Sequence, residues 1–193
     1  MKQNSLKFAI TGGIGSGKST VAEIIKRKGY AVFSCDEIYK ELLLDAEFKA
    51  KLSLNFDGII SADGSLDRSK LSEIVFNDKS ALKRLNALTH PAIIEEVLKK
   101  SSGQKISFTE VPLLFESGLE KYFDGIIVIL RDMDKRIAAV SVRDKIDRER
   151  AILRIKSQLN YENYDFAKYY VIHNDSNFED LKAKTENILE KII

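Results

Sequence analysis

The hydrophobic residues of this chain follow two alternating patterns. The first is a short run of β-branched and aromatic residues, which is typical of a buried strand. Such runs occupy residues 7–11, 31–34, 106–109, 125–130 and 169–173. Between them, apolar residues recur three and four positions apart, as at Val21, Ile24 and Ile25, and this spacing indicates one face of a helix. The alternation predicts an α/β fold with a five-stranded parallel sheet and helices on both faces.

The connection between the second and third predicted strands is much longer than the others. It spans about 70 residues, and a loop of that length without secondary structure would be unusual in a compact domain. Helical patterns occur within it at residues 36–44, 47–56, 68–76, 79–88 and 92–100. Because a proline disfavours helix at the residue before it, we expect His90 and Pro91 to separate the last two helices. These patterns predict a helical insertion beside the sheet.

A glycine-rich segment gives the strongest functional signal. Residues 12–20, GGIGSGKST, match the pattern G-x-x-x-x-G-K-[ST] and lie between a predicted strand and a predicted helix. Glycines let successive backbone N–H groups surround a polyphosphate, and the helix N-terminus adds partial positive charge. We expect Lys18 to reach the β- and γ-phosphates and the Ser19 hydroxyl to bind Mg²⁺. The alternative is a glycine-rich turn without a ligand, and a Rossmann loop fits poorly because its third glycine would fall at Lys18.

Two carboxylates come at or just after the ends of predicted strands, where open α/β sheets bind their ligands. Asp36 could orient an acceptor hydroxyl and take its proton late in phosphoryl transfer, or it could cap the helix that follows. Its position alone favours neither interpretation. Glu110 could hold the water shell of Mg²⁺ as a Walker B acid does, although a strand-end acid facing solvent is the more common arrangement.

A second candidate insertion is rich in basic residues. Residues 131–156 contain nine Lys or Arg and five Asp or Glu. Arg143 and Arg154 could close over ATP, neutralise developing charge and exclude water, whereas most of the other charges indicate a solvated helix face. His90 is more typical of a helix-end residue than of a ligand, and Cys35 of a small buried hydrophobe.

Composition and charge exclude several classes of protein. The chain has 193 residues, 44% of them hydrophobic, with one cysteine and two histidines, so an internal disulfide is impossible and a Cys/His zinc site is not expected. The formal charge of +2 argues against a dedicated nucleic-acid-binding protein. The longest apolar run, 126–130, is far below the roughly 20 residues that span a bilayer, and no secretory signal is present. We expect a cytoplasmic protein that binds no membrane, and nothing in the sequence indicates an obligate protein partner.

A set of motifs occurs in a fixed order along the chain. It comprises residues 11–20, Asp36, 63–68 (DGSLDR), His90-Pro91, 111–116 (VPLLFE), Arg143-Asp144, Gln158 and 171–174 (VIHN). Together these motifs resemble the dephospho-CoA kinase family, and the resemblance runs from about residue 7 to residue 190. The phosphate-binding loop is shared with many proteins, whereas the His-Pro pair followed by VPLLFE is much more specific.

The resemblance implies an enzyme with a P-loop kinase fold that uses ATP and Mg²⁺. It would transfer the γ-phosphate of ATP to the 3′-hydroxyl of the ribose of dephospho-CoA, yielding CoA and ADP in the last step of coenzyme A synthesis. The chain would form one kinase domain with three parts. These are a nucleotide-binding core at about 1–35, 104–130 and 168–193, a helical substrate-binding insertion at about 36–103, and a lid at about 131–167.

The resemblance also implies roles for individual residues. Asp36, Lys18 and Arg143 would be catalytic, and Ser19 would be the metal ligand. The residues expected to bind ATP are Gly13, Ile14, Gly15, Ser16, Gly17, Lys18, Ser19, Thr20 and Asn174, the last of them near the adenine. The residues expected to bind the acceptor are Asp36, Lys40, Arg68, His90 and Glu116.

The chain departs from the family pattern at four positions. Ser34 and His173 stand where an aspartate is common, and Lys40 and Ala139 stand where an arginine is common. Lys40 keeps the positive charge but loses the bidentate geometry of a guanidinium. These departures concern details of metal and phosphate contacts and leave the class of reaction unchanged.

Two other functions are compatible with a phosphate-binding loop. One is a kinase that acts on a nucleoside monophosphate or a small hydroxy acid, and the other is a nucleotide switch without enzymatic activity. The large helical insertion and Asp36 argue against the switch, because a switch needs neither an acceptor pocket nor a base.

Overall fold

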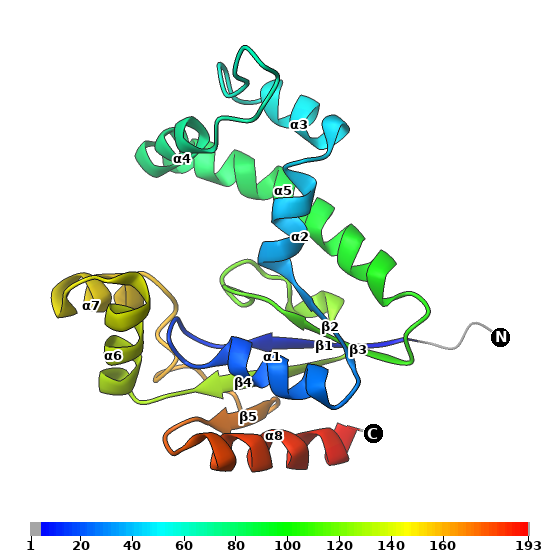
Figure 1. Cartoon of the computed structure of the whole chain (residues 1–193), viewed down its shortest axis with the longest axis vertical. Helices are drawn as coiled ribbons and strands as arrows, with labels where there is room; N and C mark the ends of the chain where they lie inside the picture. The colour runs from blue at the N-terminus through cyan, green and yellow to red at the C-terminus, as the bar shows by residue number, and fades with distance from the viewer. Residues whose placement is uncertain (1–4, 193) are drawn as a thin grey trace. The chain divides into compact units, whose positions relative to one another are not determined.

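Five parallel strands form a sheet in the computed structural model, which describes residues 5–192 (Figure 1). The strands are β1 (Leu6–Thr11), β2 (Ala31–Ser34), β3 (Ile106–Glu110), β4 (Gly125–Leu130) and β5 (Tyr170–His173). Their order in the sheet is β2-β3-β1-β4-β5, and every neighbouring pair is parallel. The five predicted strands are confirmed, two of them residue for residue and the others within one residue at one end.

The described helices are α1 (Lys18–Arg27), α2 (Cys35–Leu42), α3 (Ala46–Ser53), α4 (Arg68–Asn77), α5 (Lys79–Ser101), α6 (Met133–Asp144), α7 (Arg148–Lys156) and α8 (Phe178–Ile192), with a 3-10 helix at Glu120–Tyr122. The chain divides into two compact units. Residues 35–100 form the helical unit, and the rest of the chain forms the sheet unit.

The core of the sheet unit lies between the sheet and two helices. Phe8, Phe108 and Ile127 belong to its buried apolar cluster, together with side chains of α1 and α8 such as Ile25 and Leu189. Figure 1 shows α1 and α8 along the same side of the sheet. Residues of the opposite parity on the central strands, including Ala9 and Val128, are fully buried as well. Burial on both faces explains why these strands are continuous apolar runs rather than alternating ones.

The helical unit contains α2, α3, α4 and most of α5 around an apolar core of its own. That core consists of Leu43, Phe48, Leu52, Phe56, Ile59, Leu71, Ala81 and Leu85. Asp45 and Asp67 cap α3 and α4 by accepting hydrogen bonds from backbone amides of the first turn. The predicted helices at 36–44, 47–56 and 68–76 are present, with ends that differ by at most three residues.

The predicted helix boundary at His90 and Pro91 is wrong. α5 runs without interruption from Lys79 to Ser101 and contains Pro91 in its interior. A proline inside a helix costs about 3 kcal/mol because it removes one hydrogen bond and crowds the preceding turn. Both halves of α5 bury apolar side chains, among them Leu85 before the proline and Val97 after it, and this burial outweighs the cost of the proline.

Helices α6 and α7 form a pair within the sheet unit. Asp132 and Asp147 cap their N-termini, and the two helices share a small core of Ile137, Val140, Ala151 and Ile155. In Figure 1 the pair lies beyond the carboxyl ends of the strands, which is the edge at which β1 leads into the glycine-rich loop. Among the described residues, no helix is both long enough and apolar enough to span a membrane.

Candidate active site

The glycine-rich segment, residues 12–20, connects the end of β1 to the start of α1 and is called the phosphate loop below. Gly17 is the N-cap residue of α1 and has a φ of 101°, a left-handed conformation that side chains rarely adopt. The Lys18 ammonium donates to the carbonyl oxygens of Gly12 and Gly13, at 2.9 and 3.2 Å. The expected strand-loop-helix arrangement is therefore present, with the lysine side chain folded back over the loop.

Side chains from outside the loop bind its next three carbonyl groups. Arg136 Nε donates to the Ile14 oxygen at 3.0 Å, Arg131 Nη1 to the Gly15 oxygen at 3.2 Å, and Asn174 Nδ2 to the Ser16 oxygen at 2.8 Å. These donors neutralise the partial negative charge of the loop carbonyls. The loop can then present its N–H groups to an anion without competing repulsion from its own oxygen atoms.

Helix α6 lies directly against the phosphate loop, and two glycines make this approach possible. A Cβ atom at Gly13 would lie 2.3 Å from Arg136 Nη2, and one at Gly15 would lie 2.8 Å from the Arg136 carbonyl oxygen. Gly15 also has a φ of +78°. Gly15 therefore needs glycine for its packing and its backbone conformation, whereas a side chain at Gly13 would have to displace the guanidinium end of Arg136.

Ser19 and Glu110 bring two oxygen ligands together beside the phosphate loop. The Ser19 hydroxyl donates to Glu110 Oε1 at 2.9 Å. Glu110 ends β3, which pairs with β1, so the sheet register holds this carboxylate next to the start of α1. A hydroxyl and a carboxylate are ligand types that suit Mg²⁺. Within residues 5–192, no group of three or more His, Cys, Asp or Glu could hold a metal by itself, so a magnesium ion here would also need ligands from a nucleotide.

Arg143 and Arg154, the two arginines predicted for the lid, share one partner. Arg143 Nε and Nη2 donate to the two carboxylate oxygens of Asp144, at 2.7 and 3.1 Å, and Arg154 Nη1 also donates to that carboxylate. The two guanidinium groups hold the pKa of Asp144 below its ordinary value, so the carboxylate stays ionised. Both arginines remain more than half exposed. Asp144 therefore holds two cationic side chains close together at the surface of the helix pair.

Three predicted acceptor-binding residues line one cavity of the helical unit. Its volume is about 320 Å³, and its walls are formed by Asp36, Tyr39, Lys40, Leu43, Arg68, Leu71, Ser72, Val75 and Leu85. Asp36 lies in the first turn of α2, because that helix begins at Cys35, so the interpretation of Asp36 as an N-cap residue is wrong. Burial raises the pKa of the Tyr39 hydroxyl, and the Arg68 charge partly offsets this effect. The cavity thus combines apolar walls with an acid and two cations.

Two other predicted acceptor-binding residues do not line this cavity. His90 lies inside α5 rather than at a helix end, and partial burial lowers the pKa of its imidazole. Glu116 belongs to the sheet unit, where its carboxylate accepts a hydrogen bond from the Leu159 amide at 2.9 Å. Their roles in acceptor binding stay predictions. Cys35, predicted to be a small buried hydrophobe, is buried.

Three residues that contact the phosphate loop or the strand before it were given no role by the sequence. Gln158 Oε1 accepts a hydrogen bond from the Ile14 amide at 2.7 Å. Arg136 is 5% exposed, and burial lowers the pKa of its guanidinium. Tyr161 is also 5% exposed, and burial raises the pKa of its hydroxyl to about 12 despite a hydrogen bond with Thr11. Gln158 is part of the motif set, but Arg136 looks like any other charged residue of a basic helix, so no pattern could have singled it out.

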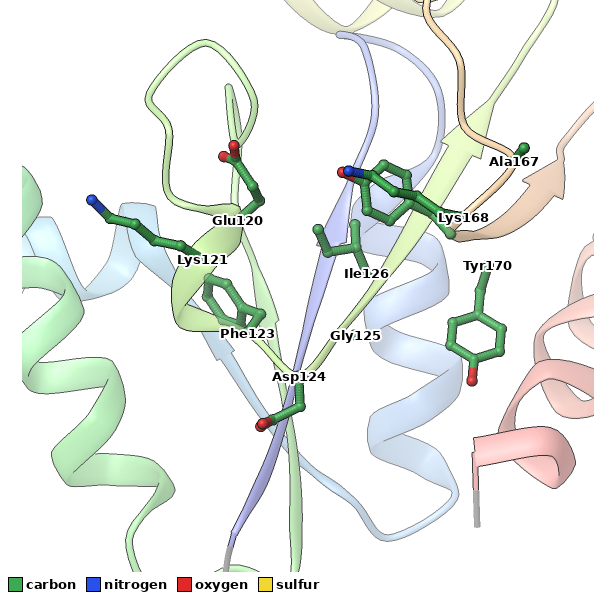
Figure 2. Close-up of a pocket in the computed structure, with 10 residues that line it drawn as sticks. Glu120, Lys121, Phe123, Asp124, Gly125, Ile126, Ala167, Lys168 and Tyr170 are labelled. Atoms are coloured by element: carbon green, nitrogen blue, oxygen red, sulfur yellow. The ribbon is translucent and has the colours of Figure 1, made fainter.

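A larger hollow lies at the amino-terminal ends of β4 and β5 and is separate from the phosphate loop and its partners. Its volume is about 580 Å³, and Figure 2 shows Glu120, Lys121, Phe123 and Asp124 on one side of it and Ala167, Lys168 and Tyr170 on the other. Gly125 and Tyr170 are the first residues of β4 and β5. The phosphate loop follows the carboxyl end of the parallel strand β1, so the hollow lies away from the loop and takes no part in the candidate site.

Comparison with known proteins gives consistent results. A family model described as dephospho-CoA kinase matches residues 6–180. The dephospho-CoA kinase of Fusobacterium nucleatum is 40% identical over 188 residues, which cover 96% of this chain and 97% of that protein. The crystal structure of TT1252 from Thermus thermophilus has a TM-score of 0.84 and 30% identity, and it covers 98% of this chain and 99% of that one. The dephospho-CoA kinase from Campylobacter jejuni has a TM-score of 0.68 and 31% identity, with 96% of each chain covered.

Proposed function

The chain belongs to the dephospho-CoA kinase family, and on this basis we propose that its phosphate loop holds ATP while Asp36 acts on the acceptor. The enzyme transfers the γ-phosphate of ATP to the 3′-hydroxyl of the ribose of dephospho-CoA and yields CoA and ADP. This is the final step of coenzyme A biosynthesis. The predicted cytoplasmic location belongs to the same proposal.

The phosphate loop is proposed to bind the triphosphate of ATP. Its carbonyl groups already have donors, namely Lys18, Arg136, Arg131 and Asn174, and the first turn of α1 adds the partial positive charge of a helix N-terminus. Upon ATP binding, the Lys18 ammonium would exchange its carbonyl partners for phosphate oxygens. The loop would thus hold the γ-phosphate while charge builds up on the departing ADP.

Magnesium is proposed to bind beside Ser19 and Glu110. Ser19 would be a direct ligand, and the Glu110 carboxylate, 2.9 Å from the Ser19 hydroxyl, would accept hydrogen bonds from water bound to the ion. When bound, Mg²⁺ neutralises charge on the phosphates during transfer. Glu110 also fixes the Ser19 side chain before any ion arrives, which lowers the entropic cost of forming the site.

The acceptor is proposed to bind in the cavity of the helical unit. Arg68 and Lys40 would attract the phosphates of dephospho-CoA, and the apolar walls would contact its less polar parts. Asp36 would orient the 3′-hydroxyl and take its proton late in the transfer, because the transition state is loose and the hydroxyl becomes acidic only as the new P–O bond forms. The proton ends on the Asp36 carboxylate, and the oxygen of the hydroxyl forms the new bond to phosphorus.

Arg143 and Arg154 are proposed to stabilise charge on the transferring phosphoryl group. Asp144 holds the two guanidinium groups together, and their exposed N–H groups remain available to an anion. Residues 131–167 would act as a lid that brings these groups over ATP and excludes water. The shared carboxylate keeps the arginines oriented, so that less side-chain entropy is lost when phosphate binds.

One observation carries the proposal: the cavity that contains Asp36 also contains Lys40 and Arg68, in a chain of this family. An assay of ATP consumption with dephospho-CoA, AMP, shikimate and gluconate as acceptors tests it. We expect turnover with dephospho-CoA. Turnover with another acceptor alone would assign the chain to a different small-molecule kinase. Tight ATP binding without turnover of any acceptor would indicate a nucleotide switch.

A further inference from the structure

Ile14 of the phosphate loop is contacted by the α6–α7 region through its carbonyl, its amide and its side chain. Its backbone carbonyl accepts a hydrogen bond from Arg136 Nε at 3.0 Å, and its backbone amide donates to Gln158 Oε1 at 2.7 Å. Its side chain packs against the shared core of α6 and α7. Arg136 belongs to α6, and Gln158 lies two residues beyond the end of α7. A residue near the start of the helix pair and a residue just after its end therefore both form hydrogen bonds with a single residue of the loop.

The environment of Arg136 indicates a specific role rather than a solvated surface charge. The residue is 5% exposed, whereas Arg148 and Arg154 of α7 are more than half exposed. Burying a guanidinium is costly unless its donors are used. Nε is bound to Ile14, whereas Nη2 is buried and has no hydrogen-bond partner among residues 5–192. A simple core position would be filled more favourably by an apolar side chain.

The Gln158 contact is unusual in a different way. A backbone N–H group of a phosphate loop is expected to face an anion, but the Ile14 N–H has a neutral amide oxygen as its partner. That bond fixes the direction of the peptide group between Gly13 and Ile14. Arg136 fixes the next peptide group, between Ile14 and Gly15, by donating a hydrogen bond to the Ile14 carbonyl. Two consecutive peptide groups are thus oriented before any nucleotide arrives.

We propose that Arg136 and Gln158 are positioning residues for ATP: together they fix the two peptide groups of Ile14 and link the phosphate loop to the α6–α7 helix pair. They act through the loop rather than on the acceptor. In consequence, their loss should weaken ATP binding while acceptor binding stays unchanged. This inference rests on the proposed binding of ATP at the phosphate loop and deepens it.

Two pairs of variants separate the hydrogen bonds from charge and packing. In Arg136→Gln the side-chain amide nitrogen falls where Nε lies in arginine, so the bond to the Ile14 carbonyl can form without the charge, whereas Arg136→Met keeps the length and lacks the donor. Gln158→Glu keeps an acceptor for the Ile14 amide but adds negative charge near the phosphates, and Gln158→Leu removes the acceptor. Arg27→Met and Gln104→Leu, at exposed sites outside this network, are the matched controls.

Steady-state kinetics with both substrates give the first test. We expect Gln158→Leu to raise KM for ATP about five- to tenfold, because it loses a hydrogen bond to a neutral amide. We expect Arg136→Met to raise it at least about tenfold, because it loses a hydrogen bond from a charged guanidinium. Arg136→Gln should recover most of the affinity lost in Arg136→Met, and KM for dephospho-CoA should stay within about twofold throughout. Because both side chains act on Ile14, the double variant Arg136→Met/Gln158→Leu should lose less than the product of the single effects.

Amide hydrogen exchange of the ligand-free protein, followed by NMR, gives a second test that needs no catalysis. The Ile14 amide should exchange at least about tenfold faster in Gln158→Leu than in the wild type and in Gln158→Glu, as expected for a lost hydrogen bond. Equal exchange in all three proteins, or an unchanged KM for ATP in both Gln158→Leu and Arg136→Met, would overturn the inference. If the wild type phosphorylates none of the acceptors, the proposed function fails, whereas the exchange experiment still decides whether Gln158 holds the loop.

Discussion

In the proposed function, the phosphate loop and the cavity of the helical unit that contains Asp36 (the acceptor cavity) recognise their ligands with different parts of the chain. The loop uses backbone groups of nine consecutive residues, and the side chains around it bind mainly its carbonyl oxygens. The cavity of the helical unit is lined by side chains from α2, α4 and α5 and by Leu43, which come from residues 36 to 85. A backbone site is tied to one local conformation, whereas a side-chain site can be changed residue by residue.

Of the four departures from the family pattern, one lies in the cavity and none lies in the phosphate loop. Lys40 lines the cavity, whereas Ser34, Ala139 and His173 lie outside both the cavity and the loop. A change of side chain in the cavity alters one contact, whereas a change in the loop alters the direction of several peptide groups at once. We therefore expect substitutions in the two regions to give distinguishable kinetic effects.

The largest effect is expected from Asp36→Asn. Loss of a positioned general base lowers turnover by roughly 10²–10⁴-fold, while ATP affinity and the unfolding temperature should stay near wild type, because Asp36 is exposed on the first turn of α2. Single-turnover phosphorylation of dephospho-CoA measures the loss. Asp57→Asn, at an exposed position of the same unit outside the cavity, should keep full turnover. Near wild-type turnover in Asp36→Asn would show that Asp36 is not the general base and that the acceptor cavity does not supply one through this residue.

Gly15→Ala should give the next largest effect. It should lower ATP affinity and stability, which Asp36→Asn leaves near wild type. The new Cβ would meet the Arg136 carbonyl and Val140 at a residue with a φ of +78°. We expect ATP affinity to fall by at least about tenfold and the free energy of unfolding to fall by about 1–3 kcal/mol, the usual cost of a strained backbone. Isothermal titration and denaturant unfolding measure the two changes.

Gly103→Ala is the matched control for the phosphate loop. Gly103 has a φ of +95°, and a Cβ there would meet nothing within 4 Å. Gly103→Ala therefore introduces the same kind of backbone strain as Gly15→Ala but no contact with α6. Destabilisation of similar size in both variants, with ATP affinity lost in neither, would show that close packing of the loop against α6 does not matter for nucleotide binding.

The two regions also differ in how far the sequence could predict them. The phosphate loop is a local pattern, so its position between β1 and α1 and its Lys18 and Ser19 were predictable from adjacent residues. For Asp36 the local pattern fits a base and a helix cap equally well, and only the family resemblance favours the base; the cavity partners Tyr39 and Leu85 carry no local signal. α5 shows the same limit, because the proline rule predicted a break that tertiary burial of both halves prevents.

Arg68→Lys should give a smaller effect that is confined to the acceptor. Lysine keeps the charge but loses the planar fork that binds phosphate at two points. We expect KM for dephospho-CoA to rise about tenfold, the value of one charged hydrogen bond, with KM for ATP unchanged. Arg27→Lys, on the exposed face of α1 where it pairs with Glu23, should change neither. A rise in KM for ATP alone would place Arg68 with the nucleotide and would contradict the division of roles.

The smallest effect concerns the pH dependence of stability in the helical unit. Burial lowers the pKa of His90 below its ordinary value of 6.5, so the folded chain keeps a neutral imidazole where the unfolded chain already binds a proton. As pH falls below 6.5, the unfolded state gains protons first, and the unfolding free energy must decrease until the folded-state pKa is passed. Thermal unfolding from pH 7.5 to pH 5 should therefore show a modest loss that His90→Gln reduces. His173→Gln, at an exposed residue at the end of β5, is the control. If His173→Gln reduced the slope instead, the acid sensitivity would belong to the sheet unit rather than to the unit that contains the acceptor cavity.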